Sequence, residues 1–215
     1  MSAKDLPTLY YVHDPMCSWC YAFEPVWGRV REMVAGRVAV KNVLGGLAPD
    51  SDVAMAEEMQ RYLIGTWRRI EGVVPGTVFN YQFWKHCKPR RSTYLACRAV
   101  IAARDQGPEH EIAMILAIQQ AYYREARNPS LPETLTEIAG EIGLNTTSFS
   151  VFLASDDCEK NLQEELALAR SLGGSGFPSL ILVRGRDAKQ IQYDYNDADA
   201  TARFIIEGKV SSAMR

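Results

Sequence analysis

Two cysteines separated by two residues, Cys17 and Cys20, are the residues of this chain best suited to chemistry. Thiols at this spacing can close a disulfide, and a thiolate can attack the disulfide of another molecule to form a mixed disulfide. The β-prone run Leu9–His13 precedes them and apolar residues at helical spacing follow, so the pair lies where a strand turns into a helix. A helix start stabilises a thiolate through its unpaired N–H groups. We therefore predict that Cys17 is the nucleophile and that Cys20 resolves the mixed disulfide.

The two residues between the cysteines, Ser18 and Trp19, carry no charge. Only the helix start then favours a Cys17 thiolate, so we expect weaker activation than in strongly oxidising C-x-x-C proteins. A C-x-x-C can also be half of a zinc site, but the sequence offers no second C-x-x-C and no H-x-x-x-H, and His13 is the only other ligand type nearby. We therefore predict no metal site.

A glycine-rich turn begins at Gly173 and runs through Gly176-Phe-Pro178 into an apolar run. The bond before a proline adopts the cis form at modest energetic cost, and glycines permit a tight turn around it. The sequence therefore favours a cis bond at Pro178, close to the start of a strand.

A β-α-β unit must position the cysteines. The helical pattern runs from Cys17 to Val34 and contains Pro25, whose missing N–H is expected to kink the helix. A second strand pattern, Val38–Leu44, ends at Gly45-Gly46. Two strands joined by a helix are most simply parallel.

Residues 49–152 show amphipathic helical patterns and no convincing strand. The expected helices are Val53–Ile70, Ser92–Arg104, Pro108–Arg124 and Leu131–Ile142. Ser92 is the expected N-cap of its helix, Pro132 fits a first turn, and Gly143 fits a helix end. Beyond this block we expect a helix Ser155–Leu172, an antiparallel strand pair Leu180–Val183 and Gln190–Tyr195, and a last helix Asp197–Gly208.

The segment Cys17-Ser-Trp-Cys20-Tyr-Ala-Phe-Glu24 resembles the C-x-x-C-Y-x-F-E segment of the DsbA family, and Gly176-Phe-Pro178 resembles the cis-proline loop of that family. The resemblance implies an α/β chain with a thioredoxin-like fold that is interrupted by an inserted helical domain. We accordingly expect a thioredoxin-like domain of residues 1–48 and 150–215 and a helical insertion domain of residues 49–149. The middle of the chain matches the family only in helicity and length.

The resemblance also implies roles for individual residues. Cys17 and Cys20 become the nucleophile and the resolving cysteine, and Pro178 the cis-proline that faces them. Glu24 becomes an acid that tunes Cys17 or relays the proton of Cys20, whereas its position alone would predict a solvated helix residue. The residue before the cis-proline, Phe177, offers its backbone to an extended substrate. The expected substrate-binding set is Ser18, Trp19, Phe177 and Gly176.

The implied activity is thiol-disulfide exchange, as a disulfide reductase or isomerase, with protein or small-molecule thiols and disulfides as substrates. Periplasmic members of the family carry a signal peptide and often a histidine between the cysteines. This chain shows neither, and it resembles the cytosolic branch of protein-disulfide isomerases. We therefore expect a cytoplasmic protein that needs no cofactor besides its redox-active disulfide, with glutathione as the co-substrate to test.

Two other functions fit the same pattern. Kappa-class glutathione transferases and 2-hydroxychromene-2-carboxylate isomerases resemble this layout and activate glutathione, but they carry serine in place of the first cysteine. A binding module with a vestigial cysteine pair is the second alternative. Intact Cys17, Cys20 and Pro178 favour the exchange reaction over both.

The charge balance excludes other partners. Lys and Arg total 24 against 26 Asp and Glu, a net charge of -2, so the chain offers no electrostatic footprint for nucleic acid or for an anionic membrane. No run of the sequence approaches the ~18 apolar residues of a membrane span. We therefore expect neither nucleic acid nor membrane as a partner.

The cysteines and large aromatic residues outside the motif are predicted to be structural. Cys97 lies in an apolar helical pattern and Cys158 is expected to be inert, with a Cys87–Cys97 disulfide as the less favoured alternative. Aromatic residues in the helical block could line a substrate groove, but most of them fit core or domain-interface packing better. These are Tyr62, Trp67, Tyr81 and Trp84.

Overall fold

The computed structural model describes residues 6–174 and 176–209. The helices are α1 (Ser18–Val34), α2 (Glu57–Val73), α3 (Phe83–His86), α4 (Tyr94–Gln106), α5 (His110–Tyr123), α6 (Pro132–Glu141), α7 (Thr146–Leu153), α8 (Asp156–Ser171) and α9 (Ala198–Glu207). The strands are β1 (Thr8–His13), β2 (Ala39–Leu44), β3 (Ser179–Arg184) and β4 (Asp187–Ile191). This order confirms the predicted β-α-β unit, helical block, helix and final β-β-α. Ser175 of the predicted glycine-rich turn and both ends of the predicted thioredoxin-like domain lie outside the described residues, and the domain boundaries stay a prediction.

The four strands form one sheet in the order β2-β1-β3-β4. β1 and β2 are parallel, with Val12 beside Val43, whereas β3 is antiparallel to both β1 and β4. Both predicted pairings are confirmed. Because Val12 also pairs with Ser179, the end of β1 that leads into Cys17 lies next to the residue that follows Pro178.

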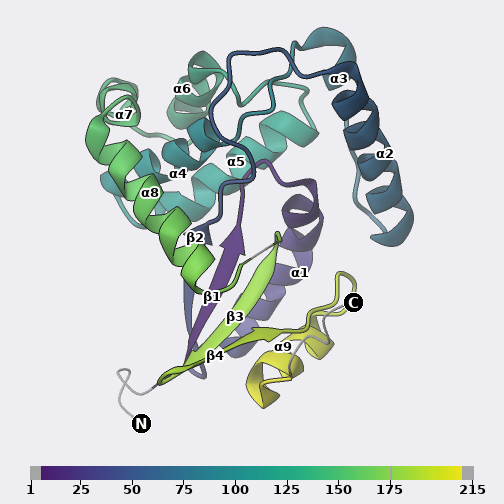
Figure 1. The fold of residues 1–215 in the computed structure, drawn as a ribbon, viewed down its shortest axis with the longest axis vertical. Coiled ribbons are helices and arrows are strands. Elements are labelled where there is room, and N and C mark those ends of the chain that lie inside the picture. The colour runs from purple at the N-terminus through teal and green to yellow at the C-terminus, as the bar shows by residue number, and fades with distance from the viewer. Residues whose placement is uncertain (1–5, 175, 210–215) are drawn as a thin grey trace.

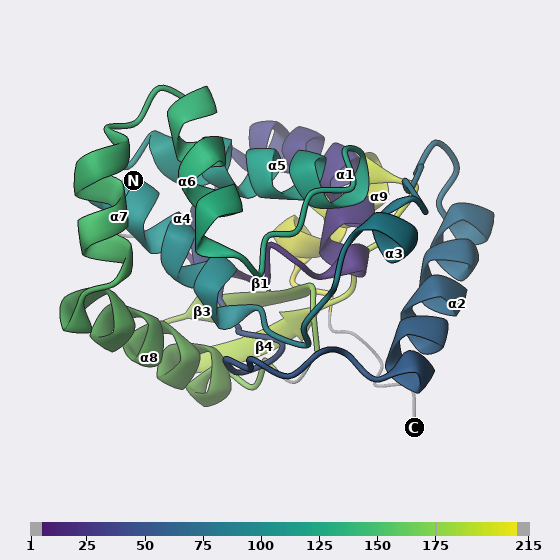
Figure 2. The same ribbon diagram turned by 90° about the horizontal axis from the view of Figure 1, so that it is seen from above.

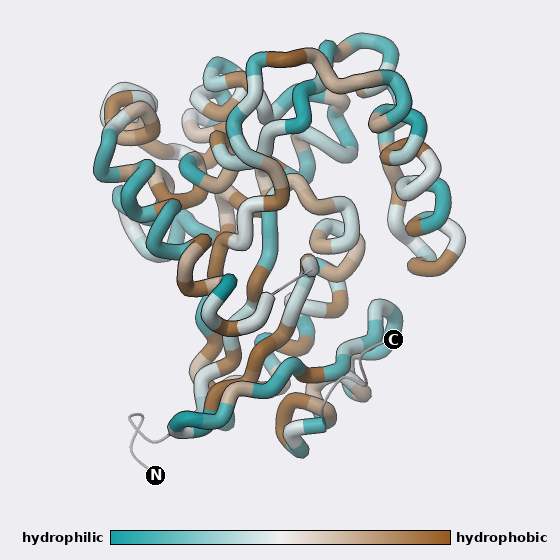
Figure 3. Tube along the Cα trace, viewed as in Figure 1, coloured by the Kyte–Doolittle hydropathy of each residue, from teal (hydrophilic) through white to brown (hydrophobic). Residues whose placement is uncertain are grey.

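Alternate residues of β1 face two different helical layers (Figure 1). Tyr11 packs with Trp27 of α1 and Ile205 of α9, while Val12 packs with Ala169 of α8. Neighbouring residues of a strand point to opposite faces of the sheet, so α1 and α9 cover one face and α8 covers the other. Figure 3 shows the hydrophobic stretches along β1 and β3 that these layers bury.

The helical block packs on the end of the sheet where β1 and β2 finish. Its core cluster centres on α4, with Cys97 and Val100 fully buried, and includes Met16 and Leu44 from the ends of these strands. Figures 1 and 2 both place α2 at the edge of the molecule, away from α6, α7 and α8. The C-x-x-C segment therefore lies where the sheet meets the helical block.

The last strand differs from the prediction. β4 spans Asp187–Ile191, whereas the alternation of apolar residues predicted Gln190–Tyr195. Gly185-Arg186 makes a two-residue turn in which Gly185 has a left-handed φ of 62°, so pairing with β3 resumes at once. Tyr193 and Tyr195 lie beyond the strand, and their rings pack on Phe23 at centroid distances of 5.0 and 5.5 Å. That packing explains their alternation without strand pairing.

Helix starts in the block also differ from the prediction. α2 begins later than the predicted Val53, because the preceding residues are extended and Ala54 forms an antiparallel bridge with Arg90. The N-cap of α4 is Thr93 rather than the predicted Ser92, and no side chain caps that helix. The short helices α3 and α7 have no counterpart in the prediction.

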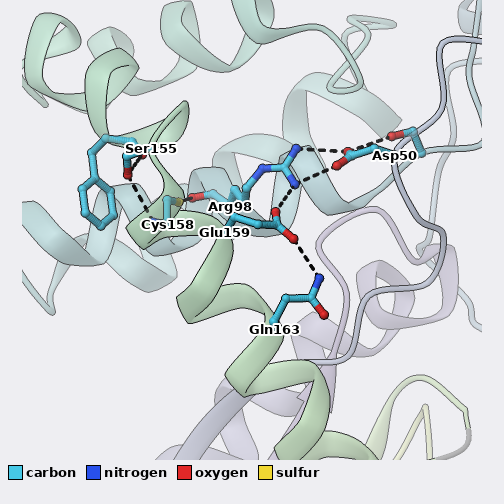
Figure 4. Close-up of polar contacts among 8 residues, drawn as sticks. Asp50, Arg98, Ser155, Cys158, Glu159 and Gln163 are labelled. Carbon is cyan, nitrogen blue, oxygen red and sulfur yellow. Dashed lines mark hydrogen bonds and ion pairs between the residues drawn. The ribbon is translucent and has the colours of Figure 1, made fainter.

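A cluster around Arg98 joins three segments of the chain (Figure 4). Arg98 of α4 pairs with Asp50, in the loop after β2, at 2.8 Å and with Glu159 of α8 at 2.7 Å. Gln163 donates to Glu159 at 2.8 Å, and the Cys158 thiol donates to the carbonyl of Arg98 at 3.4 Å. The cluster thus holds the loop that leads from β2 toward α2 against both α4 and α8.

Candidate active site

Cys17 lies at the junction between β1 and α1. It is the N-cap residue of α1, and its N–H donates to the carbonyl of Asp14 at 3.0 Å. The residue is 6% exposed, and its thiol donates to the carbonyl of Phe177 at 3.6 Å. A helix of 17 residues therefore begins at the predicted nucleophile, as the sequence indicates.

Cys20 lies one turn further along α1 and is completely buried. Burial raises the pKa of the Cys20 thiol well above its ordinary value, and the hydrogen bond and charge of Cys17 raise this pKa further. Both cysteines are free thiols. The pair thus combines one thiol that reaches a pocket with one thiol held in the core behind it.

The loop before β3 lies beside the cysteines. The Phe177–Pro178 peptide bond is cis. The hydroxyl of Tyr193 donates to the carbonyl of Pro178 at 2.9 Å, and that of Ser179 donates to the carbonyl of Gly176 at 2.6 Å. These contacts and the pairing of β3 with β1 hold the carbonyl of Phe177 over the C-x-x-C segment.

Gly45, directly after β2, allows the ring of Phe177 to approach the backbone. A Cβ atom on Gly45 would lie 2.0 Å from Cε1 of Phe177. The N–H of Gly45 donates to the carbonyl of His13 at 2.7 Å, so the backbone here is tied to β1. A side chain at position 45 must therefore displace the ring of Phe177.

We expect Gly45→Ala to lower kcat/KM for disulfide reduction by about tenfold, because displacement of the Phe177 ring shifts the carbonyl that contacts Cys17. The measurement is turnover of a chromogenic disulfide. Gly65→Ala in α2 is the matched control, since open space surrounds a Cβ there. If Phe177→Ala does not restore activity to the Gly45→Ala variant, the clash is not the cause.

Asp14 organises the segment between β1 and Cys17, although the sequence marks it only as a strand stop. It is completely buried, and one carboxylate oxygen accepts from the N–H of Met16 at 2.8 Å. The other oxygen accepts from the N–H of Leu47 and the hydroxyl of Thr93, each at 2.6 Å. Burial raises the pKa of Asp14, and these hydrogen bonds oppose the rise. One carboxylate therefore links the active-site turn, the loop after β2 and the start of α4.

The Cys17 side chain opens into a pocket of about 170 Å³. The predicted residues Ser18, Trp19 and Phe177 line it together with Cys17. Trp19 packs on Tyr195, with ring centroids 5.1 Å apart. The remaining lining residues are Met16, Leu47, Met55, Tyr62, Leu63, Thr66, Trp67, Arg90, Arg91, Ser92, Thr93, Tyr122 and Tyr123.

Two of the aromatic residues expected to be structural also line this pocket. Tyr62 is 67% exposed on α2, whereas Trp67 is almost completely buried in the helical core. Tyr81 and Trp84 pack against that core, as expected, and do not line the pocket. Tyr62 is therefore the exposed exception among these four aromatic residues.

Glu24 lies away from this pocket. Its side chain is 17% exposed and accepts from Arg31 at 2.9 Å. Burial raises the pKa of Glu24, and the Arg31 charge opposes the rise. The residue lines a second, larger cavity of about 840 Å³, together with Tyr21, Gln119 and others. The structure therefore brings Cys17, Ser18, Trp19 and Phe177 together, whereas Glu24 lies about two turns further along α1 and lines a different cavity.

The other cysteines donate to oxygen atoms. Cys97 is completely buried, and its thiol lies 3.6 Å from the carboxylate of Asp14. The Cys87 thiol lies 3.1 Å from the carbonyl of Ala126. Both thiols are free, and so is that of Cys158. The prediction that Cys97 is a core residue is confirmed. The less favoured Cys87–Cys97 disulfide is absent from the described structure.

Comparisons with solved structures show the same fold in other proteins. A candidate protein disulfide isomerase from Nitrosomonas europaea superposes with a TM-score of 0.81 at 25% identity, over 94% of this chain and 97% of that one. The cytosolic disulfide reductase DsbM from Pseudomonas aeruginosa superposes with a TM-score of 0.75 at 24% identity, over 94% of this chain and 98% of that one.

Curated relatives are longer proteins. The ClpXP adapter protein SpxH of Bacillus subtilis is 24% identical over 173 residues, which cover 80% of this chain and 56% of that protein. SpxH of Halalkalibacterium halodurans is 23% identical over 183 residues, with 57% of its length covered. This chain therefore spans less than three fifths of the length of these relatives.

The family model of thioredoxin matches residues 10–202 of this chain. These residues include the cysteine pair, the helical block and the cis-proline loop. A protein of Streptomyces coelicolor described as a probable DsbA oxidoreductase shares the fold. It superposes with a TM-score of 0.68 at 17% identity, over 95% of this chain and 92% of that one. The chain belongs to the thioredoxin family and has the fold of DsbA-type thiol-disulfide oxidoreductases.

Proposed function

We propose that this chain is a disulfide reductase or isomerase whose redox pair is Cys17 and Cys20. The observation that carries the proposal is the asymmetry of the pair. Cys17 reaches a pocket at the start of α1, while Cys20 lies fully buried behind it and in contact with it. A substrate can approach the first thiol, and only Cys17 can approach the second.

The exchange runs in two steps. The Cys17 thiolate attacks one sulfur of a substrate disulfide, that bond breaks, and the other substrate sulfur leaves as a thiolate. Cys20 then loses its proton and attacks the sulfur of Cys17, which releases the second substrate thiol and leaves a Cys17–Cys20 disulfide. Two electrons have passed to the substrate. Burial raises the pKa of Cys20, so its proton stays in place until the mixed disulfide forms close by.

Three residues take supporting roles in this proposal: Phe177, Glu24 and Pro178, whose peptide bond to Phe177 is cis. The carbonyl of Phe177, which accepts from the Cys17 thiol in the free protein, becomes an acceptor for the backbone of an extended substrate. Glu24 receives the proton of Cys20. Glu24 follows Cys20 by four residues in α1, so the two side chains lie one turn apart on the same face of the helix.

The reducing direction fits a cytoplasmic location. None of the helices in residues 6–174 and 176–209 is both long and apolar enough to cross a membrane. A relative of the same fold is a cytosolic disulfide reductase, and it has also been solved with glutathione at 23% identity to this chain. We therefore include glutathione as the thiol that reduces the Cys17–Cys20 disulfide.

Replacement of Cys20 by serine tests the proposal. Treatment of the reduced wild type with dithiobis(nitrobenzoic acid) should release two thionitrobenzoate anions for each Cys17–Cys20 disulfide formed. Cys20→Ser should release one anion and keep the other as a stable adduct on Cys17, because the resolving thiol is absent. Intact mass and peptide mapping identify the adduct.

A Cys87→Ser background prevents reaction at the partly exposed third thiol. Cys17→Ser in that background should form no adduct at the motif. Loss of adduct formation in Cys17→Ser but not in Cys20→Ser supports the assigned order of attack. The alternative function, a kappa-class glutathione transferase or a 2-hydroxychromene-2-carboxylate isomerase, predicts instead that Cys20→Ser leaves catalysis unchanged, although the reagent still labels Cys17.

A further inference from the structure

The pocket that contains Cys17 is positively charged although the whole chain is not. Two arginines, Arg90 and Arg91, are among its lining residues, and no aspartate or glutamate of the described chain lines it. The net charge of the protein is -2, so this positive charge is a local property of the pocket. An anionic molecule is therefore attracted to the surroundings of the Cys17 thiol.

The two arginines differ in their partners. Arg90 pairs with the fully exposed carboxylate of Asp52 at 3.2 Å. Arg91 has no carboxylate within 4.0 Å in the part of the chain that the structure describes, although it is half-buried. Tyr122 is another lining residue, and burial raises the pKa of its hydroxyl. The charge of Arg91 opposes this rise, because the guanidinium lies near the buried ring. Among the described residues Arg91 is thus a half-buried cation with no carboxylate partner, and its N–H donors can bind a ligand.

A third guanidinium contacts Trp19, one of the residues that line the pocket. Arg69 of α2 lies over the ring of Trp19, with its central carbon 5.8 Å from the ring centroid. Neutral hydroxyl groups of Thr66 and Ser92 also line the pocket. A carboxylate that enters beside Cys17 therefore meets a guanidinium able to bind it through two parallel hydrogen bonds, with further donors around it.

The size of the pocket limits the ligand. A cavity of about 170 Å³ is smaller than the roughly 300–1,000 Å³ typical of pockets that enclose a drug-sized ligand. This accommodates a thiol-bearing side chain and one attached carboxylate group. A charged group beyond that must lie at the rim, toward Arg69.

We infer that Arg91 binds the carboxylate of a small anionic thiol or of its disulfide, and so selects such compounds as the redox partner of Cys17. The inference rests on the proposed function. The thiolate of the partner attacks the Cys17 sulfur of the Cys17–Cys20 disulfide, that bond breaks, and Cys20 leaves as a thiolate and takes up a proton. A second partner thiolate attacks the mixed disulfide and releases Cys17. Two thiols have become one disulfide, and their two electrons reduce the protein.

The test compares an anionic and a neutral thiol. Oxidised wild type, Arg91→Gln and Arg68→Gln are reduced by glutathione and by mercaptoethanol, with each rate divided by the thiolate fraction of the reagent. Arg68 is a matched control because it is exposed on α2 and does not line the pocket. We expect Arg91→Gln to slow glutathione about tenfold and mercaptoethanol by less than about twofold. Added salt should reduce the wild-type preference for glutathione.

Each other outcome has a defined meaning. Equal slowing of both thiols means that Arg91 acts on Cys17 itself, which overturns the inference but not the exchange reaction. No preference for glutathione in the wild type also overturns it. Failure of both thiols to reduce the pair contradicts the proposed function instead. Arg91→Lys, which keeps the charge, should recover part of the glutathione rate and shows whether loss in Arg91→Gln comes from misfolding.

Discussion

Replacement of His13 by phenylalanine should abolish most of the acid sensitivity of folding. Burial lowers the pKa of His13 from 6.5 to about 3, and the charges of Arg31 and Arg104 contribute. His13 of the unfolded chain is therefore protonated below pH 6.5, whereas His13 of the folded protein stays neutral down to about pH 3. The titration of His13 costs no stability above pH 6.5. Below that pH the free energy of unfolding falls by about 1.4 kcal/mol for each pH unit. By pH 4.5 the loss from this residue is about 3 kcal/mol.

Phenylalanine suits the site because it keeps the ring and removes the titration. The His13 ring stacks on Tyr11 at a centroid distance of 4.9 Å and an interplanar angle of 7°. Neither ring nitrogen has a hydrogen-bond partner within the described residues, so the substitution also removes two unsatisfied buried polar atoms. We expect the variant to equal or exceed the wild type in stability at pH 7.5.

Urea denaturation of the reduced protein at pH 7.5, 6 and 4.5 measures the effect. Asp14 and Glu24 shift in the opposite sense, because burial raises the pKa of each carboxyl and folding then gains stability as pH falls. Both residues are present in wild type and variant, so the difference between the two proteins isolates His13. An unchanged acid slope in His13→Phe would falsify the assignment.

Local sequence signals predicted the elements that carry the redox pair. The change from a β-prone run to helical spacing places Cys17 at the start of α1, and the structure agrees. Ser155 and Asp197, at the expected starts of the last two helices, accept from the N–H groups of Cys158 and Ala200 as N-caps. These signals depend on residues within one helical turn, so they are visible without the fold.

Features that depend on distant residues have no such signal. Asp14 contacts Leu47 and Thr93, which lie 33 and 79 residues away. Arg91 and Cys17 line the same pocket only because the helical block packs on the end of the sheet. The sequence pattern predicts only that Gly45 ends a strand, whereas in the structure Gly45 leaves space for the ring of Phe177. Tertiary contact decides each of these positions, and the sequence pattern around them is ordinary.

Loss of the Asp14 carboxylate should be among the most damaging single changes outside the cysteine pair. Asp14→Ala leaves the N–H groups of Met16 and Leu47 without their acceptor, while the Thr93 hydroxyl keeps the carbonyl of Ala48 at 3.3 Å. Each unsatisfied buried donor costs about 1–3 kcal/mol, so we expect a loss of at least about 2 kcal/mol in the free energy of unfolding. Urea denaturation at pH 7.5 measures it.

The same change should also slow catalysis, because the three donors belong to walls of the active-site pocket. Met16, Leu47 and Thr93 all line it beside Cys17, so their displacement alters the approach to the thiol. We expect kcat/KM for disulfide reduction to fall about tenfold or more under conditions in which the variant is fully folded. Asp52→Ala, at a fully exposed carboxylate, is the matched control for stability.

Asp14→Asn separates the two effects. The carboxamide oxygen can still accept from Met16, but its NH₂ group meets the N–H of Leu47, where two donors oppose each other. The NH₂ group can donate to the Thr93 hydroxyl, which already lies 3.3 Å from the carbonyl of Ala48. Stability should therefore fall less than in Asp14→Ala, while activity stays reduced because the loop at Leu47 moves. Wild-type turnover in a folded Asp14→Ala variant would show that the carboxylate supports the fold alone and leaves the position of Cys17 to the Phe177 carbonyl and the start of α1.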